Sequence, residues 1–154
     1  MKKLFLLLTL LLCTSMAWAY DVEVDGIYYN LNQTNKTATV TFEGSSYDSY
    51  DNEYSGEVVI PENFIYDGIT YSVTSLGYEC FRYCTGLTSI TIPNSVTSWG
   101  NYCFLDCTGL TNIKMESSTP PSTSTWPFSR CSSLTTVYVP KGAKEAYNVK
   151  PWNS

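Results

Sequence analysis

The sequence predicts an α/β repeat fold: a short solenoid of about 3.5–4 coils of about 23 residues each, preceded by an N-terminal β-hairpin cap. Three observations predict it. One pattern of apolar, glycine and cysteine residues recurs at a fixed spacing in the second half of the chain. Each copy contains a short stretch with the alternation of a β-strand, and the segment before the repeat carries two alternating apolar tracks separated by a polar turn.

The first residues predict an export signal. Lys2 and Lys3 precede an apolar run over 4–12, which is shorter than the roughly 20 residues that a membrane span needs. The run is followed by a small-x-small cleavage pattern, so we expect residues 1–19 to be a signal peptide that is cleaved after Ala19. An alternative treats Cys13 as a lipid-anchored cysteine, but the residue before it is not small. We therefore expect a secreted or cell-surface protein that meets the membrane only during export.

The charge of the mature chain argues against nucleic acid as a partner. Without residues 1–19 the chain keeps seven basic and fourteen acidic residues, a net charge of −7, which repels phosphate backbones. The chain contains no histidine, which removes His-based triads and the commonest general base. Nothing in the sequence places two carboxylates across a cleft, so we predict no enzyme and no cofactor.

Residues 20–57 are expected to form the cap and a loop. Apolar residues alternate over 22–31 and again over 38–42, and the polar stretch 32–37 between them is turn-like, which predicts a β-hairpin. Such a hairpin would cover the open end of the solenoid. The stretch 44–57 is rich in tyrosine and acidic residues and lacks aliphatic ones, so we expect an exposed loop.

Residues 58–154 are expected to form the solenoid with a C-terminal cap. Two copies of the pattern lie in 76–115 at an offset of 23, and a third follows at an offset of 24. A degenerate first copy covers 58–77 and is stretched by about nine residues. The matched positions of the two best copies are Gly77 and Gly100, Cys80 and Cys103, Phe81 and Phe104, Cys84 and Cys107, Leu87 and Leu110, and Ile90 and Ile113.

Each copy reads L-x-x-L-x-L, the pattern of a short strand that lines a solenoid. The alternation predicts that Ile90 and Ile92 point inward and Thr91 outward, with Pro93 ending the strand. The returning arm, 96–107, has apolar residues every three or four positions. That spacing predicts a short helical turn, in which a glycine would allow a bend.

The residues 87–100 and 103–111 closely resemble the repeat of the BspA-like leucine-rich-repeat family, and the resemblance extends over about 58–150. It implies a leucine-rich-repeat solenoid that is exported to the surface of anaerobic gut or oral bacteria, adhesion to host or neighbouring-cell ligands, and no catalysis. Two features depart from the family pattern: Cys80 and Cys103 stand where alanine is common, and only a few repeats are present where adhesins often have many.

The cysteines and the acidic loop raise possible metal sites. Cys80, Cys84, Cys103 and Cys107 have permissible spacing for zinc, Cys84 and Cys107 could form a disulfide between stacked coils, and all could be buried thiols of the repeat. We favour buried thiols. The carboxylates suited to calcium are Asp48, Asp51, Glu53 and Glu57, but their spacing departs from the standard calcium loop, so we expect a solvated acidic loop and no metal.

The sequence predicts a binding module that uses the outward side of the strands. The expected ligand-binding residues are Thr88, Ser89, Thr91, Thr111, Asn112, Lys114, Thr135, Thr136 and Tyr138. A secondary binding loop is expected at Tyr47, Tyr50 and Tyr54, because exposed aromatic rings suit protein or sugar recognition; the competing interpretation is partial packing of the loop on the hairpin. The expected partner is a host extracellular or bacterial surface protein. Two other functions stay open: a structural spacer or assembly module, and a glycan-binding accessory protein.

Overall fold

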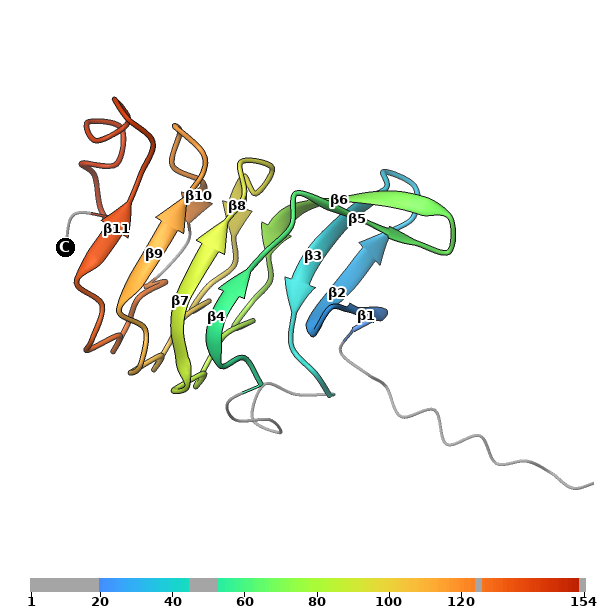
Figure 1. Ribbon diagram of the computed structural model, residues 1–154, viewed down its shortest axis with the longest axis horizontal. Coiled ribbons are helices and arrows are strands. Elements are labelled where there is room, and N and C mark those ends of the chain that lie inside the picture. The colour runs from blue at the N-terminus through green and yellow to red at the C-terminus, as the bar shows by residue number, and fades with distance from the viewer. Residues whose placement is uncertain (1–19, 45–52, 124–125, 153–154) are drawn as a thin grey trace, which may run out of the picture.

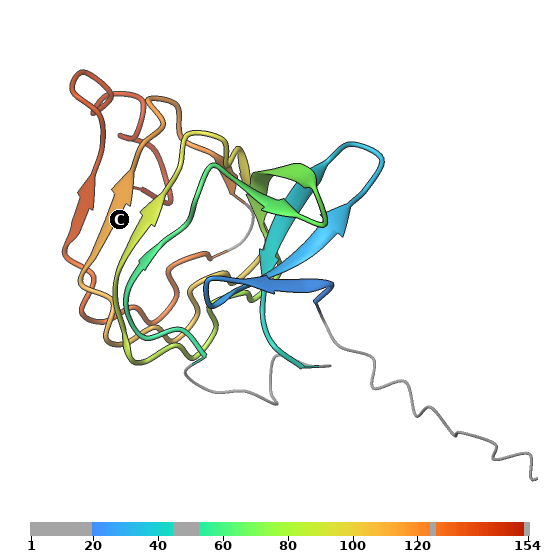
Figure 2. The same ribbon diagram turned by 45° about the vertical axis from the view of Figure 1, so that its right-hand side comes forward.

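The computed structural model describes residues 20–44, 53–123 and 126–152. Within them, eleven strands form two sheets that lie on opposite sides of one core (Figures 1 and 2). The expected signal peptide, including Cys13, lies outside the described residues. The strands are β1 (Val22–Val24), β2 (Ile27–Asn32), β3 (Thr37–Thr41), β4 (Gly56–Val59), β5 (Asn63–Tyr66), β6 (Ile69–Leu76), β7 (Leu87–Ile92), β8 (Ser98–Trp99), β9 (Asn112–Met115), β10 (Ser122–Thr123) and β11 (Thr136–Tyr138).

The first sheet is parallel and follows the repeat directly. Its order is β11-β9-β7-β4, and the register places residues of equal repeat position side by side. Ile90 pairs with Ile113, and Ile113 with Val137. Because each coil places its strand on the previous one, successive copies continue the ladder of backbone hydrogen bonds, as a solenoid requires.

The second sheet joins the N-terminal segment to the returning arms of the coils. Its order is β1-β2-β3-β6-β8-β10, and β5 pairs with β6 outside this path. The expected hairpin is present as β2 and β3, which pair antiparallel from Tyr28 with Thr41 to Asn32 with Thr37. Strand β3 then pairs parallel with β6, so the hairpin extends the sheet of the returning arms.

The extra residues of the first copy form a β-hairpin of their own. Strands β5 and β6 pair antiparallel, and their turn contains Asp67 and Gly68 in the left-handed backbone region. The end of β6 then returns to the repeat pattern, since Leu76 pairs with Trp99 of the next copy. The hairpin projects beyond the coils at one end of the long axis of the molecule (Figure 1).

The prediction of a helical turn over 96–107 is wrong, because the described residues contain no helix. Residues with positive φ interrupt the arm at four-residue intervals, at Tyr102 (φ 56) and Asp106 (φ 60). The backbone hydrogen bonds run between coils: the N–H of Phe81 donates to Cys103 O at 2.8 Å, and that of Phe104 to Pro127 O at 3.0 Å. The fold is therefore an all-β solenoid, and the α/β class predicted from the spacing is corrected.

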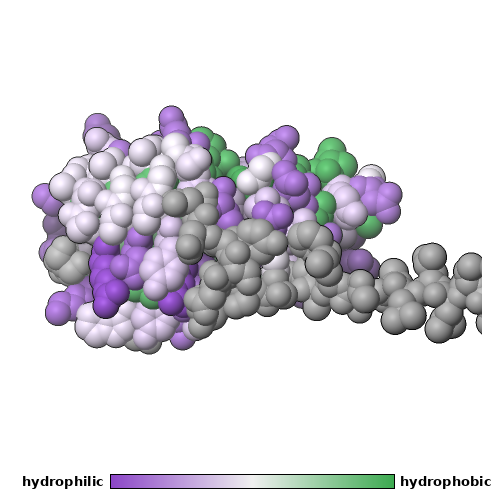
Figure 3. All heavy atoms as spheres, turned by 90° about the horizontal axis from the view of Figure 1, so that it is seen from below, coloured by the Kyte–Doolittle hydropathy of each residue, from purple (hydrophilic) through white to green (hydrophobic). Residues whose placement is uncertain are grey.

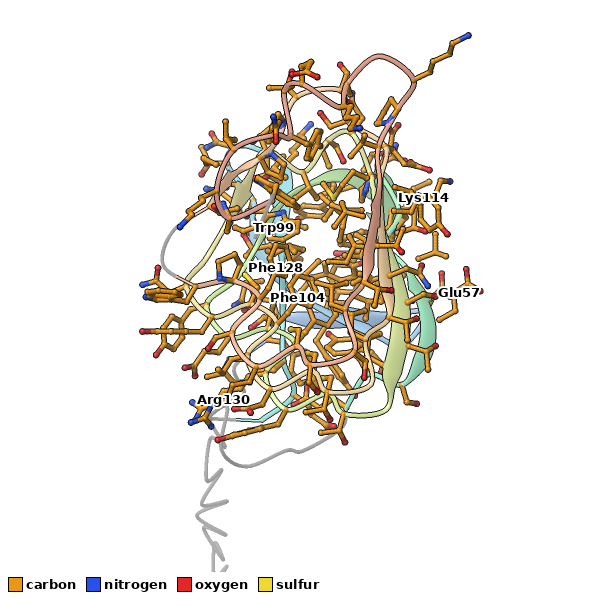
Figure 4. The ribbon with its side chains drawn as sticks, turned by 90° about the vertical axis from the view of Figure 1, so that its left-hand side faces the viewer. Glu57, Trp99, Phe104, Lys114, Phe128 and Arg130 are labelled. Carbon is orange, nitrogen blue, oxygen red and sulfur yellow. The ribbon has the colours of Figure 1, made fainter. Side chains whose placement is uncertain are left out.

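The predicted inward residues form the core. Leu87, Ile90 and Ile92 are buried, and so are Leu110, Ile113 and Met115 of the next copy. A column of stacked rings runs through the coils, with Phe81 and Phe104 parallel at 5.0 Å between centroids and Phe104 and Phe128 at 6.0 Å. Figure 4 shows Trp99, Phe104 and Phe128 between the two layers.

Glycine at position 100 is required by the approach of two coils. A Cβ there would lie 2.6 Å from the backbone N of Tyr78 and 2.7 Å from the carbonyl carbon of Gly77, closer than such atoms can come. The sequence predicted that this glycine allows a bend. The structure gives a different reason, because the backbone of one coil packs directly on the backbone of the one before it.

Candidate functional site

The outward side of the parallel sheet carries two straight rows of side chains. The register aligns one residue of each coil with its equivalents, because parallel coils repeat the same alternation. The Tyr138 row contains Val59, Thr91, Lys114 and Tyr138. The Thr136 row contains Glu57, Ser89, Asn112 and Thr136. We call these two rows together the sheet face; Figure 4 shows Glu57 and Lys114 directed away from the core.

The members of the Tyr138 row differ in exposure. Tyr138 is 57% exposed, Val59 is 58% exposed and Lys114 is exposed too, whereas Thr91 is only 9% exposed. Thr91 lies between the larger side chains of the neighbouring strands, which shelter it although it points outward. The Lys114 ammonium lies 3.1 Å from the carboxylate of Glu116, an exposed pair that stays accessible to a ligand.

Two of the predicted face residues, Thr111 and Thr135, lie just before their strands and bind the preceding coil. The Thr111 hydroxyl donates to Thr88 O at 2.9 Å, and the Thr135 hydroxyl donates to Thr111 O at 3.4 Å. The hydroxyl hydrogens are thus used between coils. These threonines offer a ligand an acceptor oxygen, and a structural role accounts for their recurrence.

Sequence reasoning missed two residues of the sheet face, Glu57 and Val59. The signal was available in the degenerate first copy, where Val58-Val59-Ile60 aligns with Ile90-Thr91-Ile92. That alignment places Val59 in the same outward position as Thr91, and the two residues are paired in the register of β4 and β7. Glu57 gives the face a negative charge at one end, opposite the aromatic ring of Tyr138 at the other.

The prediction that Tyr54 is an exposed residue of a secondary binding loop is wrong. The other two tyrosines of that loop, Tyr47 and Tyr50, lie outside the described residues. Tyr54 is 2% exposed, and its ring lies 4.7 Å from that of Phe81. Its hydroxyl donates to Thr41 O at 2.7 Å and accepts the N–H of Tyr28 at 3.1 Å. Burial raises the pKa of Tyr54 well above its usual value. Tyr54 therefore joins the cap to the first coil and is not available to a ligand.

The five described cysteines are free thiols that form columns between coils. The Cys107 thiol donates to Phe81 O at 2.9 Å, and the Cys131 thiol donates to Phe104 O at 2.9 Å. Both of these thiols thus bond to a carbonyl of the preceding coil. The hydrogen bond to Cys131 and burial raise the pKa of Cys107, and the same contact lowers that of Cys131.

The described residues contain no group of three or more metal-ligating side chains placed to hold an ion. The four cysteines with permissible spacing for zinc are among the described residues and form no such group. Of the four carboxylates suited to calcium, Asp48 and Asp51 lie outside the described residues. None of the described segments forms a helix long and apolar enough to cross a membrane.

A cleft of about 580 Å³ lies apart from the sheet face, beside the returning arm of the last coil. Trp126, which is 69% exposed, lines it together with Pro127 and Phe128, and the other lining residues include Lys150 and Pro151. Sequence reasoning did not single out this tryptophan. Its repeat position corresponds to Tyr102 and Glu79, all three with positive φ, but Glu79 is buried and Tyr102 is half-buried, so of the three only Trp126 is exposed.

These features define a solenoid repeat protein with an outward sheet of aligned side chains. The chain belongs to the BspA-type leucine-rich-repeat family, whose model matches residues 57–148 with six copies. The family and the fold are those of protein-interaction or surface repeat modules, which generally lack enzymatic activity.

Solved structures of bacterial leucine-rich-repeat proteins share the fold. A protein from Bacteroides ovatus is 29% identical with a TM-score of 0.60, over 77% of this chain and 29% of that one. A leucine-rich cell-surface protein from Faecalibacterium prausnitzii is 25% identical with a TM-score of 0.56, over 77% of this chain and 31% of that one. The chain thus spans less than a third of both. A Bacteroides capillosus protein shows the fold at 24% identity and a TM-score of 0.54, over 77% of this chain and 96% of that one. No curated protein matches the chain.

Proposed function

We propose that the protein is an exported surface module that adheres to host or neighbouring-cell proteins through the sheet face. The observation that carries the proposal is the alignment of outward side chains in two rows across four strands, with exposed members in three of those strands. The family and the cell-surface relative support a surface location. The rows combine an aromatic ring, an aliphatic side chain and both signs of charge, which suits contact with a protein.

The dimensions of the sheet face predict weak binding by one copy. Four strands about 4.8 Å apart, each presenting about four residues of about 3.3 Å, give roughly 250 Å² of planar face. A standard stable interface buries about 800 Å² on each partner. We therefore expect one domain to bind with a Kd of micromolar or weaker, so that adhesion requires several copies acting together.

The test compares variants of the Tyr138 row on immobilised extracellular-matrix proteins. Tyr138→Ala and Lys114→Ala each remove a large exposed contact and should weaken saturable binding several-fold. The matched control is Asn94→Ala, since Asn94 is exposed just beyond the end of β7. Tight nanomolar binding by a monomer, or binding that neither row variant changes, would place the site elsewhere.

A second candidate function, glycan binding, is favoured by the cleft beside Trp126. Its volume is that of a small-ligand site, and an exposed indole with neighbouring proline rings offers flat apolar surface on which a sugar ring can stack. A glycan array separates the two functions. Glycan binding that Trp126→Ala abolishes and Tyr138→Ala leaves unchanged would favour the cleft over the sheet face.

A further inference from the structure

The last coil has an incompletely covered end. Phe128, Leu134 and Val137 are only partly buried, whereas their equivalents in the coil before, such as Phe104 and Leu110, are 0% exposed. A hollow of about 320 Å³ lies between the last coil and Trp152. Among the described strands, β11 pairs only with β9, so its other edge carries unpaired backbone groups. We call this end of the molecule the tail.

The opposite end carries an exposed apolar hairpin. In the β5–β6 hairpin, Ile65 is 71% exposed, Tyr66 is 43% and Ile69 is 37%. Strand β5 pairs only with β6 in the part of the chain that the structure describes, so it also has an unpaired edge. We call this hairpin the head. The head and β11 lie at opposite ends of the long axis (Figure 1), and apolar atoms appear toward the head end in the view from below (Figure 3).

Charge distinguishes the two ends. Residues 20–79 contain eleven acidic residues and one basic residue, whereas 126–152 contain four basic residues and one acidic residue. Glu62 and Asp67 flank the head, and Lys141 and Lys144 follow β11; all four are exposed. Contact between two tails would place like charges together, and contact between two heads would do the same. Contact between a head and a tail pairs opposite charges.

We propose that copies of this chain associate head to tail, with the β5–β6 hairpin of one copy docked on the exposed end of the last coil of the next. The exposed Ile65 and Tyr66 would contact Phe128, Leu134 and Trp152, which line the hollow together with polar residues. The free edges of β5 and β11 would pair with each other. Because the two surfaces differ, the contact is heterologous, and because they lie at opposite ends of the long axis, repeated contacts extend into linear chains. The association deepens the adhesion proposed above, since a chain presents many sheet faces to one surface.

The test measures the weight-average mass of the mature protein by analytical ultracentrifugation. At low salt the mass should rise at least about two-fold between about 10 µM and 1 mM, and it should fall back toward the monomer in 0.5 M NaCl, where exposed charges are screened. A monomer mass throughout this range would overturn the proposal. Association is measured without any ligand, so its failure does not bear on adhesion, and the failure of adhesion does not bear on it.

Two variants identify the ends. Ile65→Lys disables the head, and Lys141→Glu combined with Lys144→Glu disables the tail; all three residues are exposed, so the fold should persist. Each variant alone should be monomeric. Their mixture still contains one intact head and one intact tail, and should therefore form heterodimers and nothing larger. Self-association of the Ile65→Lys variant alone, or no association in the mixture, would refute the head-to-tail contact.

Matched controls come from the sheet face. Val59→Lys changes an exposed aliphatic residue of a strand, as Ile65→Lys does, and Lys114→Glu reverses an exposed lysine. Both should leave the mass at each concentration unchanged, because neither residue belongs to the head or the tail. A loss of association in these controls equal to that in the head and tail variants would show a nonspecific effect of charge and overturn the proposal.

Discussion

Phe81, Phe104 and Phe128 form a column of stacked rings, and the loss of stability on removing one ring should depend on whether that ring lies inside the column or at its end. Phe104 is fully buried, with ring centroids 5.0 Å from Phe81, 6.0 Å from Phe128 and 5.4 Å from Trp99. Phe104→Ala leaves a cavity that the coils on both sides cannot fill, so the free energy of unfolding should fall by about 4–5 kcal/mol, the upper part of the usual range. With a urea m-value of about 1.5–2 kcal/mol/M for a domain of this size, the midpoint should fall by about 2–3 M.

The matched variant is Phe128→Ala, which changes the same residue type at the same repeat position one coil later. Phe128 is partly buried and has a coil on one side only, so we expect about 2 kcal/mol, roughly half the cost of full burial. Urea melts followed by circular dichroism give both values. If the two variants lose equal stability, or Phe128→Ala loses more, Phe104 is not the internal ring and Phe128 is not the terminal ring of the column. Phe104→Leu leaves a smaller cavity than alanine and should cost less than Phe104→Ala, so it provides a measurable value if Phe104→Ala fails to fold.

Three further predictions concern backbone packing, pH and thiol reactivity. Gly100→Ala should cost at least about 2 kcal/mol in urea melts, because the added Cβ must push the coil away from Gly77. Burial raises the pKa of Glu53 from 4.5 to about 7, so its contribution to stability is present at low pH and is lost as the pH rises toward and through 7. The melting temperature should therefore fall between pH 5 and pH 8, and Glu53→Gln should remove part of that fall. Cys131 should react first with a thiol reagent at pH 8, because its pKa is lowered and it is partly exposed, while Cys107 should react only on unfolding.

Each of these three has a clear opposite outcome. Wild-type stability in the glycine variant would mean that the two coils are not in backbone contact. A melting temperature that changes equally with pH in Glu53→Gln and in the wild type would show that this carboxyl is ordinarily solvated. In the labelling experiment, Cys131→Ser is the control. If the rapid phase survives in that variant, a different thiol is the reactive one.

The repeat, the inward residues and the hairpin could be predicted from the sequence because they depend on local periodicity. The L-x-x-L-x-L pattern determines which side chains of a strand lie on one side, whatever the rest of the chain does. Thus Leu110 and Ile113 are fully buried as predicted. The family followed from the same columns, and the extent of the match over 57–148 agrees with the region that resembled it.

The tertiary structure decided the conformation of the returning arm and the role of individual residues. A three- or four-residue apolar spacing is shared by a helical turn and by a chain of turns, and the choice depended on hydrogen bonds to the next coil, such as that from Phe104 to Pro127. Tyr54 looked exposed because its sequence neighbours are polar, yet its ring packs on Phe81 of a distant segment. Side-chain burial depends on what lies across the fold. The alternation of the sequence determined which residues form the sheet face. The side chains that lie next to each of these residues in the folded protein decided that Thr91 is sheltered and that Tyr138 is accessible.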